Sequence, residues 1–224
     1  MSAFPFAIVG FDLDGTLFDT SLDLTDALNH ALVGLGRAPL RVEAVKPMIG
    51  RGGLHMLEQG LAASGGFDAA MLERSYAELM TFYEANIARN TRPFDGLLDA
   101  MDLLDARGVK LAVVTNKRER LAVKLVAELG MTSRFATVIG GDTMGPGNAK
   151  PSPLPIQEMV RRCGGGPAAF VGDSIFDILA AKHAGVPSVA VSFGFLMQPV
   201  EELGADAVID SYAELVPALE RLGR

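Results

Sequence analysis

The sequence predicts an α/β protein with a doubly wound, Rossmann-like parallel sheet and a small helical insert after the first strand. Two observations predict this fold. Six short apolar runs alternate with stretches of helical spacing, and one long segment, residues 18–92, departs from that alternation. Strands that alternate with helices form a parallel sheet covered by helices on both faces.

The first predicted strand is the continuous apolar run Ala7–Phe11, which has β-branched Ile8 and Val9 near its centre. A short, uninterrupted apolar run is typical of a strand that is buried on both faces. Similar runs occur at Lys110–Thr115, Phe135–Ile139, Ala168–Gly172, Ser188–Ser192 and Asp206–Ile209.

Helical spacing separates most of these runs. Apolar residues recur at helical intervals from Leu97 to Leu104 and from Leu121 to Leu129, and each stretch is followed by a glycine that can end a helix. Segment 18–92 contains no convincing strand run and carries two helical stripes instead. Their members are Leu24, Leu28, Leu32 and Leu35 in the first, and Leu72, Tyr76, Leu79 and Tyr83 in the second. We therefore predict a core of residues 1–17 and 93–224 that is interrupted by a helical domain, 18–92.

Bulk properties exclude several classes of partner. The chain has 224 residues and a formal net charge of −7, which opposes general affinity for nucleic acid or anionic membranes. Its single cysteine, Cys163, cannot form an intrachain disulfide, so a reducing cytoplasm is the simplest location. The apolar N-terminal stretch up to Phe11 is too short to span a membrane and lacks the basic residues of a signal peptide. We expect a cytoplasmic monomer or homodimer.

Polar residues follow three of the predicted strands. Asp12 and Asp14 follow the first, Thr115 and Asn116 end the second, and Asp173 follows the run that ends at Gly172. Ligands of open parallel sheets bind beyond the carboxyl ends of the strands. These side chains are therefore expected to converge at one edge of the sheet.

Two carboxylates one residue apart at a strand end repel one another, and a cation would relieve that repulsion. Asp173 offers a third carboxylate and Asp177 a nearby partner, and oxygen ligands of this kind suit Mg²⁺. A simpler alternative is that Asp173 and Asp177 only cap the following helix. One of them could do so, but four carboxylates in these positions favour a metal site.

Thr115, Asn116 and Lys150 are candidate phosphate ligands. The first two offer hydroxyl and amide donors at a strand end, and Lys150 offers a point charge before a proline-rich loop. Each motif alone is common in turns, so their order along the chain gives them their weight.

Taken in order, these motifs resemble those of the haloacid dehalogenase superfamily. The motifs are Asp12-Leu13-Asp14-Gly15-Thr16, Thr115-Asn116, Lys150-Pro151 and Gly172-Asp173-Ser174-x-x-Asp177. The resemblance covers nearly the whole chain. The residues around the motifs are similar to those of phosphoglycolate phosphatases. It implies that segment 18–92 is the small mobile cap of this superfamily.

The resemblance also implies a mechanism. Asp12 would attack phosphorus to form an aspartyl-phosphate, and Asp14 would act as general acid and then general base. Mg²⁺ would be bound by the Asp12 carboxylate, the Asp14 backbone carbonyl and Asp173, with Asp177 organising its waters. Thr115, Asn116 and Lys150 would hold the phosphoryl oxygens. The carboxylate at position 14 favours phosphatases over dehalogenases and phosphonate-cleaving members, which lack it.

Two further cations lie near these motifs. Arg51, in Gly50-Arg51-Gly52-Gly53, either pairs with a substrate carboxylate from a cap loop or belongs to a surface turn. Lys117 follows the Thr-Asn pair and lies either at the rim of the site or in solvent.

The leading functional prediction is a phosphatase for a small phosphorylated acid, most plausibly 2-phosphoglycolate. A phosphatase for a sugar phosphate or nucleotide, and a phosphomutase of the β-phosphoglucomutase type, remain alternatives. Such mutases tend to carry a Ser-Arg pair in the cap loop, where this chain has Gly50-Arg51. A third alternative is a catalytically silent binding protein, which four intact motifs oppose.

Overall fold

A computed structural model describes residues 4–223 and contains a six-stranded parallel sheet in the order β5-β4-β1-β6-β7-β8. The strands are β1 (Ile8–Phe11), β4 (Lys110–Val114), β5 (Thr137–Ile139), β6 (Ala168–Gly172), β7 (Ser188–Val191) and β8 (Ala207–Ile209). All six predicted runs are strands, with ends shifted by at most two residues, and the predicted fold class is confirmed.

Strand β1 lies at the centre of the sheet because it pairs with β4 on one side and β6 on the other. Its side chains alternate between two apolar layers. Val9 and Phe11 belong to one core cluster, whereas Ile8 belongs to another. A strand buried on both faces leaves the continuous apolar run that the sequence shows.

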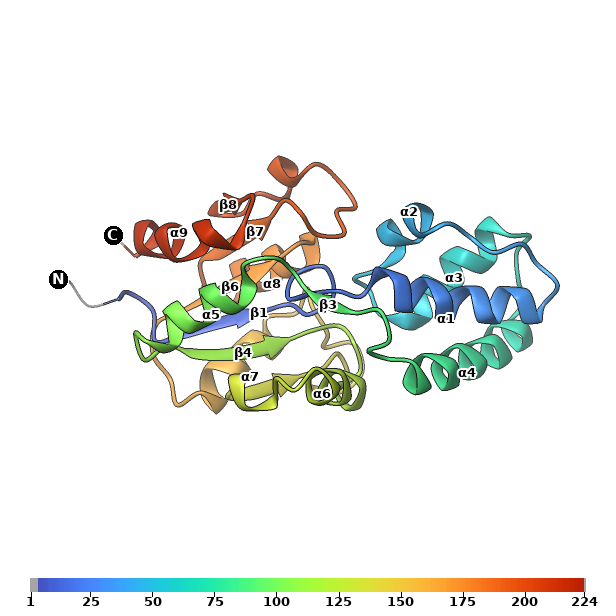
Figure 1. The fold of residues 1–224 in the computed structure, drawn as a ribbon, viewed down its shortest axis with the longest axis horizontal. Coiled ribbons are helices and arrows are strands. Elements are labelled where there is room, and N and C mark those ends of the chain that lie inside the picture. Colours follow the sequence, from blue (N-terminus) through green and yellow to red (C-terminus); the bar gives the residue numbers. More distant parts are fainter. Residues whose placement is uncertain (1–3, 224) are drawn as a thin grey trace.

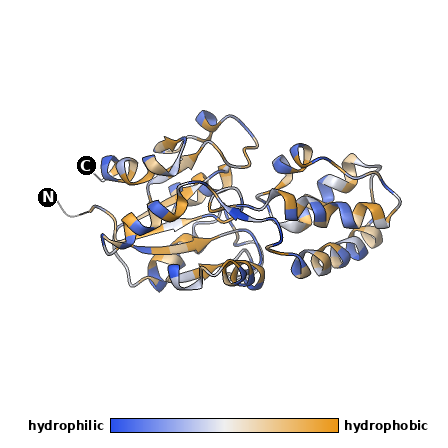
Figure 2. Cartoon of the chain, viewed as in Figure 1, coloured by the Kyte–Doolittle hydropathy of each residue, from blue (hydrophilic) through white to orange (hydrophobic). Residues whose placement is uncertain are grey.

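Helices cover both faces of the sheet (Figure 1). On one face lie α5 (Leu97–Asp105), α6 (Glu119–Glu128) and α9 (Leu215–Leu222), and on the other α7 (Leu154–Arg162) and α8 (Ile175–Ala184). Figure 2 shows apolar residues concentrated in the strands, whereas the helices carry both apolar and polar residues. Gly108 and Gly130, with φ of +73° and +70°, follow the ends of α5 and α6, as predicted for glycines that end helices.

A separate group of helices is inserted between β1 and β4 and lies beyond one end of the sheet (Figure 1). It consists of α1 (Ser21–Gly34), α2 (Val42–Val45), α3 (Gly53–Ala63) and α4 (Ala69–Ala85). Leu24, Leu28 and Leu32 of α1 and Leu79 and Tyr83 of α4 are buried, in agreement with the two predicted stripes.

Two very short strands were not expected from the sequence. They are β2 (Phe18–Asp19) and β3 (Arg92–Pro93), which pair antiparallel where the chain enters and leaves the helical group. Two residues are too few to produce a period in the sequence, and Pro93 removes one backbone donor.

Among residues 4–223, no helix combines the length and apolar character needed to cross a lipid bilayer.

Candidate active site

The carboxyl ends of three neighbouring strands carry the predicted site residues. Asp12 follows β1 and its backbone N–H donates to the carbonyl of Val171 on β6, which continues the ladder beyond the last strand residue. Thr115 follows β4, and Asp173 follows β6. The parallel order of the sheet therefore brings together residues far apart in the chain, as the sequence predicted.

Three buried carboxylates form a cluster at this edge. Asp12, Asp173 and Asp177 each offer an oxygen atom, and these atoms all lie within 4.8 Å of one another. Oxygen ligands that are few and negatively charged fit a hard divalent cation such as Mg²⁺. The cluster could therefore hold a divalent metal ion.

Asp173 is held in place by two donors from other parts of the chain. The Thr16 hydroxyl donates to Asp173 Oδ1 at 3.1 Å, and the backbone N–H of Phe195 donates to Oδ2 at 2.6 Å. Burial, together with the charges of Asp177 and Asp12, raises the pKa of Asp173 well above its ordinary value. A carboxylate in this setting gains from a bound cation because the cation compensates its buried charge.

Asp177 has two roles in the structure. Its Oδ2 accepts a hydrogen bond from the Ser174 backbone N–H at 3.0 Å, which is part of the capping box of α8, and another from the Ser174 hydroxyl at 2.6 Å. Its Oδ1 lies 2.5 Å from Lys150 Nζ. The capping alternative is thus correct for Asp177, but the same side chain also belongs to the carboxylate cluster.

Lys150 supplies the positive charge of this cluster. Its ammonium lies 2.8 Å from Asp12 Oδ1 and donates to the carbonyl of Val114 at 2.8 Å. Although burial alone would lower the pKa of Lys150, the charges of Asp12 and Asp177 raise it. Burial raises the pKa of Asp12 to about 6 even though Lys150 opposes the change.

The Asp14 carboxylate lies outside the three-carboxylate cluster and faces the helical group. Thr20 donates to its Oδ1 at 2.7 Å, and Lys117 Nζ lies 2.9 Å from its Oδ2. Lys117 also donates to the Tyr83 hydroxyl of α4 at 2.9 Å. Burial raises the pKa of Tyr83 to about 12, although the charge of Lys117 opposes this change. Burial alone would lower the pKa of Lys117, but Asp14 and Tyr83 outweigh it and raise that pKa.

The position of Lys117 shows that its solvated alternative is wrong, because the residue is only 7% exposed. No sequence pattern identifies this contact. Tyr83 belongs to a helical stripe that is typical of core packing. It contacts Lys117 because of how the helical group is placed against the sheet edge.

Thr115 and Asn116 directly follow β4, at the edge of the sheet that carries the carboxylates. Thr115 Oγ1 accepts a hydrogen bond from the backbone of Lys117 at 3.2 Å. The Asn116 amide donates to the carbonyls of Gly50 at 3.0 Å and Lys150 at 3.2 Å, so it joins the cap-loop sequence to the sheet edge. Its Oδ1 is buried and has no hydrogen-bond partner within residues 4–223.

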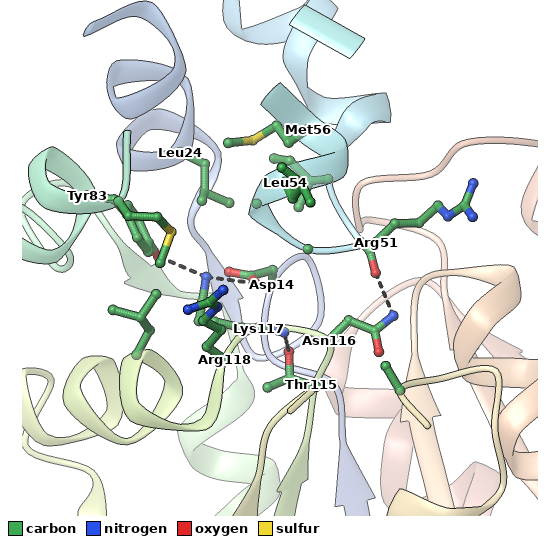
Figure 3. Close-up of a pocket in the computed structure, with 18 of the residues that line it drawn as sticks. Asp14, Leu24, Arg51, Leu54, Met56, Tyr83, Thr115, Asn116, Lys117 and Arg118 are labelled. Carbon is green, nitrogen blue, oxygen red and sulfur yellow. Dashed lines mark hydrogen bonds and ion pairs between the residues drawn. The ribbon is translucent and has the colours of Figure 1, made fainter. Parts of the chain in front are cut away.

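A cavity of about 270 Å³ lies between the sheet edge and the helical group. Asp12, Asp14 and Thr115 line it from the sheet side, and apolar residues including Leu24 and Met56 line it from the helices (Figure 3).

Arg51 lines this cavity, but its exposed side chain points away from Asp14 (Figure 3). Its guanidinium lies 5.2 Å from the centre of the Phe176 ring, which is a cation–π contact. The structure therefore gives Arg51 a packing contact on α8 rather than a place beside the carboxylates.

The haloacid dehalogenase-like hydrolase family matches residues 9–191. The chain belongs to this family. The predicted family is thus confirmed, and the four motifs that predicted it all lie at the edge of the sheet that carries the cavity.

Curated relatives of this hydrolase cover almost its whole length. A phosphoglycolate phosphatase of Agrobacterium fabrum is 40% identical over 218 residues, which are 96% of this chain and 92% of the relative. A phosphoglycolate phosphatase of Caulobacter vibrioides is 40% identical over 95% of this chain and 90% of its own. The crystal structure of a predicted phosphoglycolate phosphatase from Haemophilus somnus superimposes with a TM-score of 0.88 at 26% identity, covering 95% of this chain and 97% of that one.

Proposed function

We propose that this hydrolase is a Mg²⁺-dependent phosphatase that converts 2-phosphoglycolate to glycolate and phosphate through an aspartyl-phosphate on Asp12. Its enzyme class, a phosphoric monoester hydrolase, is confirmed by the family and by the curated relatives. The observation that carries the finer proposal is the position of Asp12. This carboxylate lines the cavity, lies in the metal-binding cluster and is paired with Lys150.

The choice of substrate rests on size and on the relatives. A cavity of about 270 Å³ suits a small ester better than a nucleotide. Relatives that are 40% identical over nearly the whole chain carry the name phosphoglycolate phosphatase. The cavity favours a small ester, and the relatives favour a phosphorylated two-carbon acid.

The first chemical step would break the bond between phosphorus and the ester oxygen. A carboxylate oxygen of Asp12 forms a bond to phosphorus, and Asp14 donates its proton to the departing glycolate oxygen. In the second step Asp14 takes a proton from water, whose oxygen attacks phosphorus and releases Asp12 and inorganic phosphate. A Mg²⁺ ion would be held by Asp12, Asp173 and the Asp14 carbonyl. It would supply positive charge that compensates the phosphoryl oxygens.

Three residues would hold the phosphoryl group. Lys150 offers a charge held beside Asp12 and Asp177, and a phosphoryl oxygen would replace one of its three present partners, Asp12, Asp177 or the Val114 carbonyl. Thr115 and Asn116 add a hydroxyl and an amide beside it. Asp177 has both carboxylate oxygens engaged by Lys150 and Ser174, which favours a role in organising metal-bound water rather than direct coordination.

Residues 18–92 would form the cap domain and residues 1–17 and 93–224 the core. The contacts from Tyr83 to Lys117 and from Asn116 to Gly50 join the two parts across the cavity. Closure at these contacts would exclude water from the reacting phosphate. The single cysteine, Cys163, which cannot form an intrachain disulfide, supports an enzyme of the cytoplasm.

Phosphate release from a panel of small esters tests this proposal. The panel contains 2-phosphoglycolate, a sugar phosphate and a nucleotide, each with Mg²⁺ and with chelator. We expect the highest kcat/KM for 2-phosphoglycolate, loss of activity with chelator, and no activity in Asp12→Asn. Equal activity in chelator would refute the metal, and a preferred sugar phosphate would refute the substrate. Isomerisation of a sugar phosphate with little phosphate release would indicate a mutase.

A further inference from the structure

Lys117 is a buried cation that the proposed chemistry does not use. Its side chain is 6% exposed and contacts two partners from opposite sides of the cavity, Asp14 Oδ2 at 2.9 Å and the Tyr83 hydroxyl at 2.9 Å. Figure 3 shows its ammonium between these two groups, facing the space that the cavity residues enclose.

Each carboxylate oxygen of Asp14 already has one partner. Thr20 binds Asp14 Oδ1 and Lys117 binds Oδ2, so both carboxylate oxygens are occupied in this structure. A general acid must present an oxygen to the leaving group within hydrogen-bond distance. Exchange of the Lys117 contact would leave the Oδ2 atom of Asp14 free for this role.

An anionic group on the substrate can replace Asp14 as the partner of Lys117. In 2-phosphoglycolate a single carbon separates the carboxylate from the ester oxygen that Asp14 would protonate. When the ester oxygen of this substrate contacts Asp14, the substrate carboxylate is therefore close to Lys117. The Lys117 ammonium already lies 2.9 Å from Asp14. Exchanging one carboxylate for another preserves the charge balance of a buried lysine.

Other cations of the cavity are less suited to this role. Arg51 and Arg118 are both exposed and lie over aromatic rings, Phe176 at 5.2 Å and Tyr76 at 5.6 Å. Lys150 is buried but is already paired with two carboxylates at the phosphate end. Of these four cations, Lys117 alone is both buried and paired with the residue that faces the leaving group.

We propose that Lys117 is the specificity-determining residue that binds the substrate's carboxylate and, by exchanging partners, releases Asp14 for the leaving group. This inference rests on the phosphatase function proposed above and deepens it. An ester with a carboxylate one carbon from its ester oxygen draws Lys117 away from Asp14, whereas a neutral ester leaves the ion pair intact. The Tyr83 hydroxyl keeps the ammonium in place during the exchange.

The test compares kcat/KM for 2-phosphoglycolate with kcat/KM for 2-hydroxyethyl phosphate, in which an uncharged hydroxymethyl group replaces the carboxylate. The variants are Lys117→Met, Lys117→Gln as a milder polar change, and Lys182→Met as the control. Lys182 is exposed on α8 and gives the same chemical change and the same change in net charge. Thermal unfolding of each purified variant reports whether it is folded.

We expect Lys117→Met to lower the ratio of the two kcat/KM values by about 30-fold, because a buried charge-assisted contact to the carboxylate is lost. Any effect of the substitution that acts through Asp14 alone applies to both esters and therefore cancels in the ratio. Lys182→Met should keep the parent's ratio. If Lys117→Met does not fold, Lys117→Gln is expected to show the same change in ratio.

Three outcomes separate this inference from the proposed function. An unchanged ratio in a folded Lys117 variant overturns the inference while 2-phosphoglycolate remains the substrate. A third ester, carboxylated but with a longer carbon chain, extends the test. A parent enzyme that prefers this ester to 2-phosphoglycolate, and loses that preference in Lys117→Met, overturns the substrate and supports the inference. A parent that hydrolyses neutral and carboxylated esters equally well overturns the inference, because no carboxylate is then recognised.

Discussion

Asp23 accepts two hydrogen bonds from Thr91, one from the backbone N–H at 2.9 Å and one from the hydroxyl at 2.7 Å. The same carboxylate accepts from the backbone and the side-chain amide of Asn90. Asp23 lies in the first turn of α1 and Thr91 immediately precedes β3, so this contact joins the two connections between the helical group and the sheet. Both Asp23 and Thr91 are buried.

Removal of this carboxylate is expected to destabilise the fold. Asp23→Ala leaves buried donors on Thr91 without an acceptor, which should lower the free energy of unfolding by about 3 kcal/mol. For a chain of this size, that loss corresponds to a Tm lower by about 10 °C. Thermal and urea unfolding of the purified variant measure the change.

Asp26→Ala is the matched control, since Asp26 is exposed on the same helix and the change in charge is identical. It should alter the free energy of unfolding by about 0.5 kcal/mol or less. If the two variants unfold at the same denaturant concentration, the contact with Thr91 does not stabilise the connections.

Gly194 lies against Asp173 so closely that a larger side chain cannot fit. A Cβ atom at position 194 would overlap the Asp173 side chain and lie 2.7 Å from the carbonyl of Gly15. Gly194→Ala is therefore expected to displace Asp173 and to weaken Mg²⁺ binding by about 10-fold, in the range seen for changes next to metal ligands. Titration calorimetry with Mg²⁺ measures this affinity.

Gly34→Ala serves as its control because position 34 is exposed and its new Cβ would meet only Glu78 Oε2, at 3.4 Å. Mg²⁺ affinity should be the same as in the parent. An unchanged affinity in Gly194→Ala would mean that the Asp173 side chain can shift without loss of the metal site.

The strand ends of the candidate site could be predicted from the sequence because burial on both faces leaves an uninterrupted apolar run. Once β1, β4 and β6 are recognised, a parallel sheet places Asp12, Thr115 and Asp173 at one edge. The residue types at these positions then indicate a metal and a phosphate site.

Contacts that depend on the helical group could not be predicted in this way. Lys117 meets Tyr83 across 34 positions of sequence, and the burial of both follows from how α4 lies against the sheet edge. The second donor to Asp173 is the backbone N–H of Phe195, which leaves no side-chain signal at all. The direction of the Arg51 side chain depends on Phe176, in a helix more than a hundred residues later.

Lys150 compensates the charges of two buried carboxylates. Its removal should therefore lower the stability of the metal-free protein. Lys150→Met leaves Asp12 and Asp177 without the cation that lies 2.8 and 2.5 Å away. We expect the free energy of unfolding in chelator to fall by about 3 to 5 kcal/mol, as for other broken buried ion pairs. Saturating Mg²⁺ should restore part of this loss because it supplies positive charge to the same carboxylates.

Lys110→Met is the control, since Lys110 is an exposed lysine whose ammonium donates to a carbonyl, that of Cys163, and not to a buried carboxylate. Urea unfolding of both variants with chelator and with Mg²⁺ gives the comparison. A Lys150→Met protein as stable as the parent in chelator would show that the two aspartates are protonated or hydrated there.

The raised pKa of Asp12 makes the stability of the metal-free protein depend on pH. Burial raises this pKa from 3.8 to about 6, although Lys150 opposes the change. A carboxyl group whose pKa is higher in the folded state stabilises the fold fully below its unfolded pKa. That contribution is lost as the pH rises through the folded pKa.

Asp12→Asn removes the free-energy cost of a buried negative charge at high pH, because the amide is neutral and has nearly the same shape as the carboxyl group. At about pH 4 the variant and the parent should unfold with similar free energies, and above about pH 7 the variant should be more stable, by on the order of 3 kcal/mol at most. The attraction of Lys150 is already part of this balance, and Lys150 keeps its contact with Asp177 in the variant.

Urea unfolding in chelator across this pH range measures the difference, with Asp26→Asn as an exposed control that should show no such trend. In saturating Mg²⁺ the order should reverse, since bound metal stabilises the charged parent and the variant lacks a ligand. A parent that is at least as stable as Asp12→Asn at high pH in chelator would mean that Lys150 fully compensates the buried charge of Asp12. The affinity of the site for Mg²⁺ would then have to come from the negative charge of the substrate phosphate.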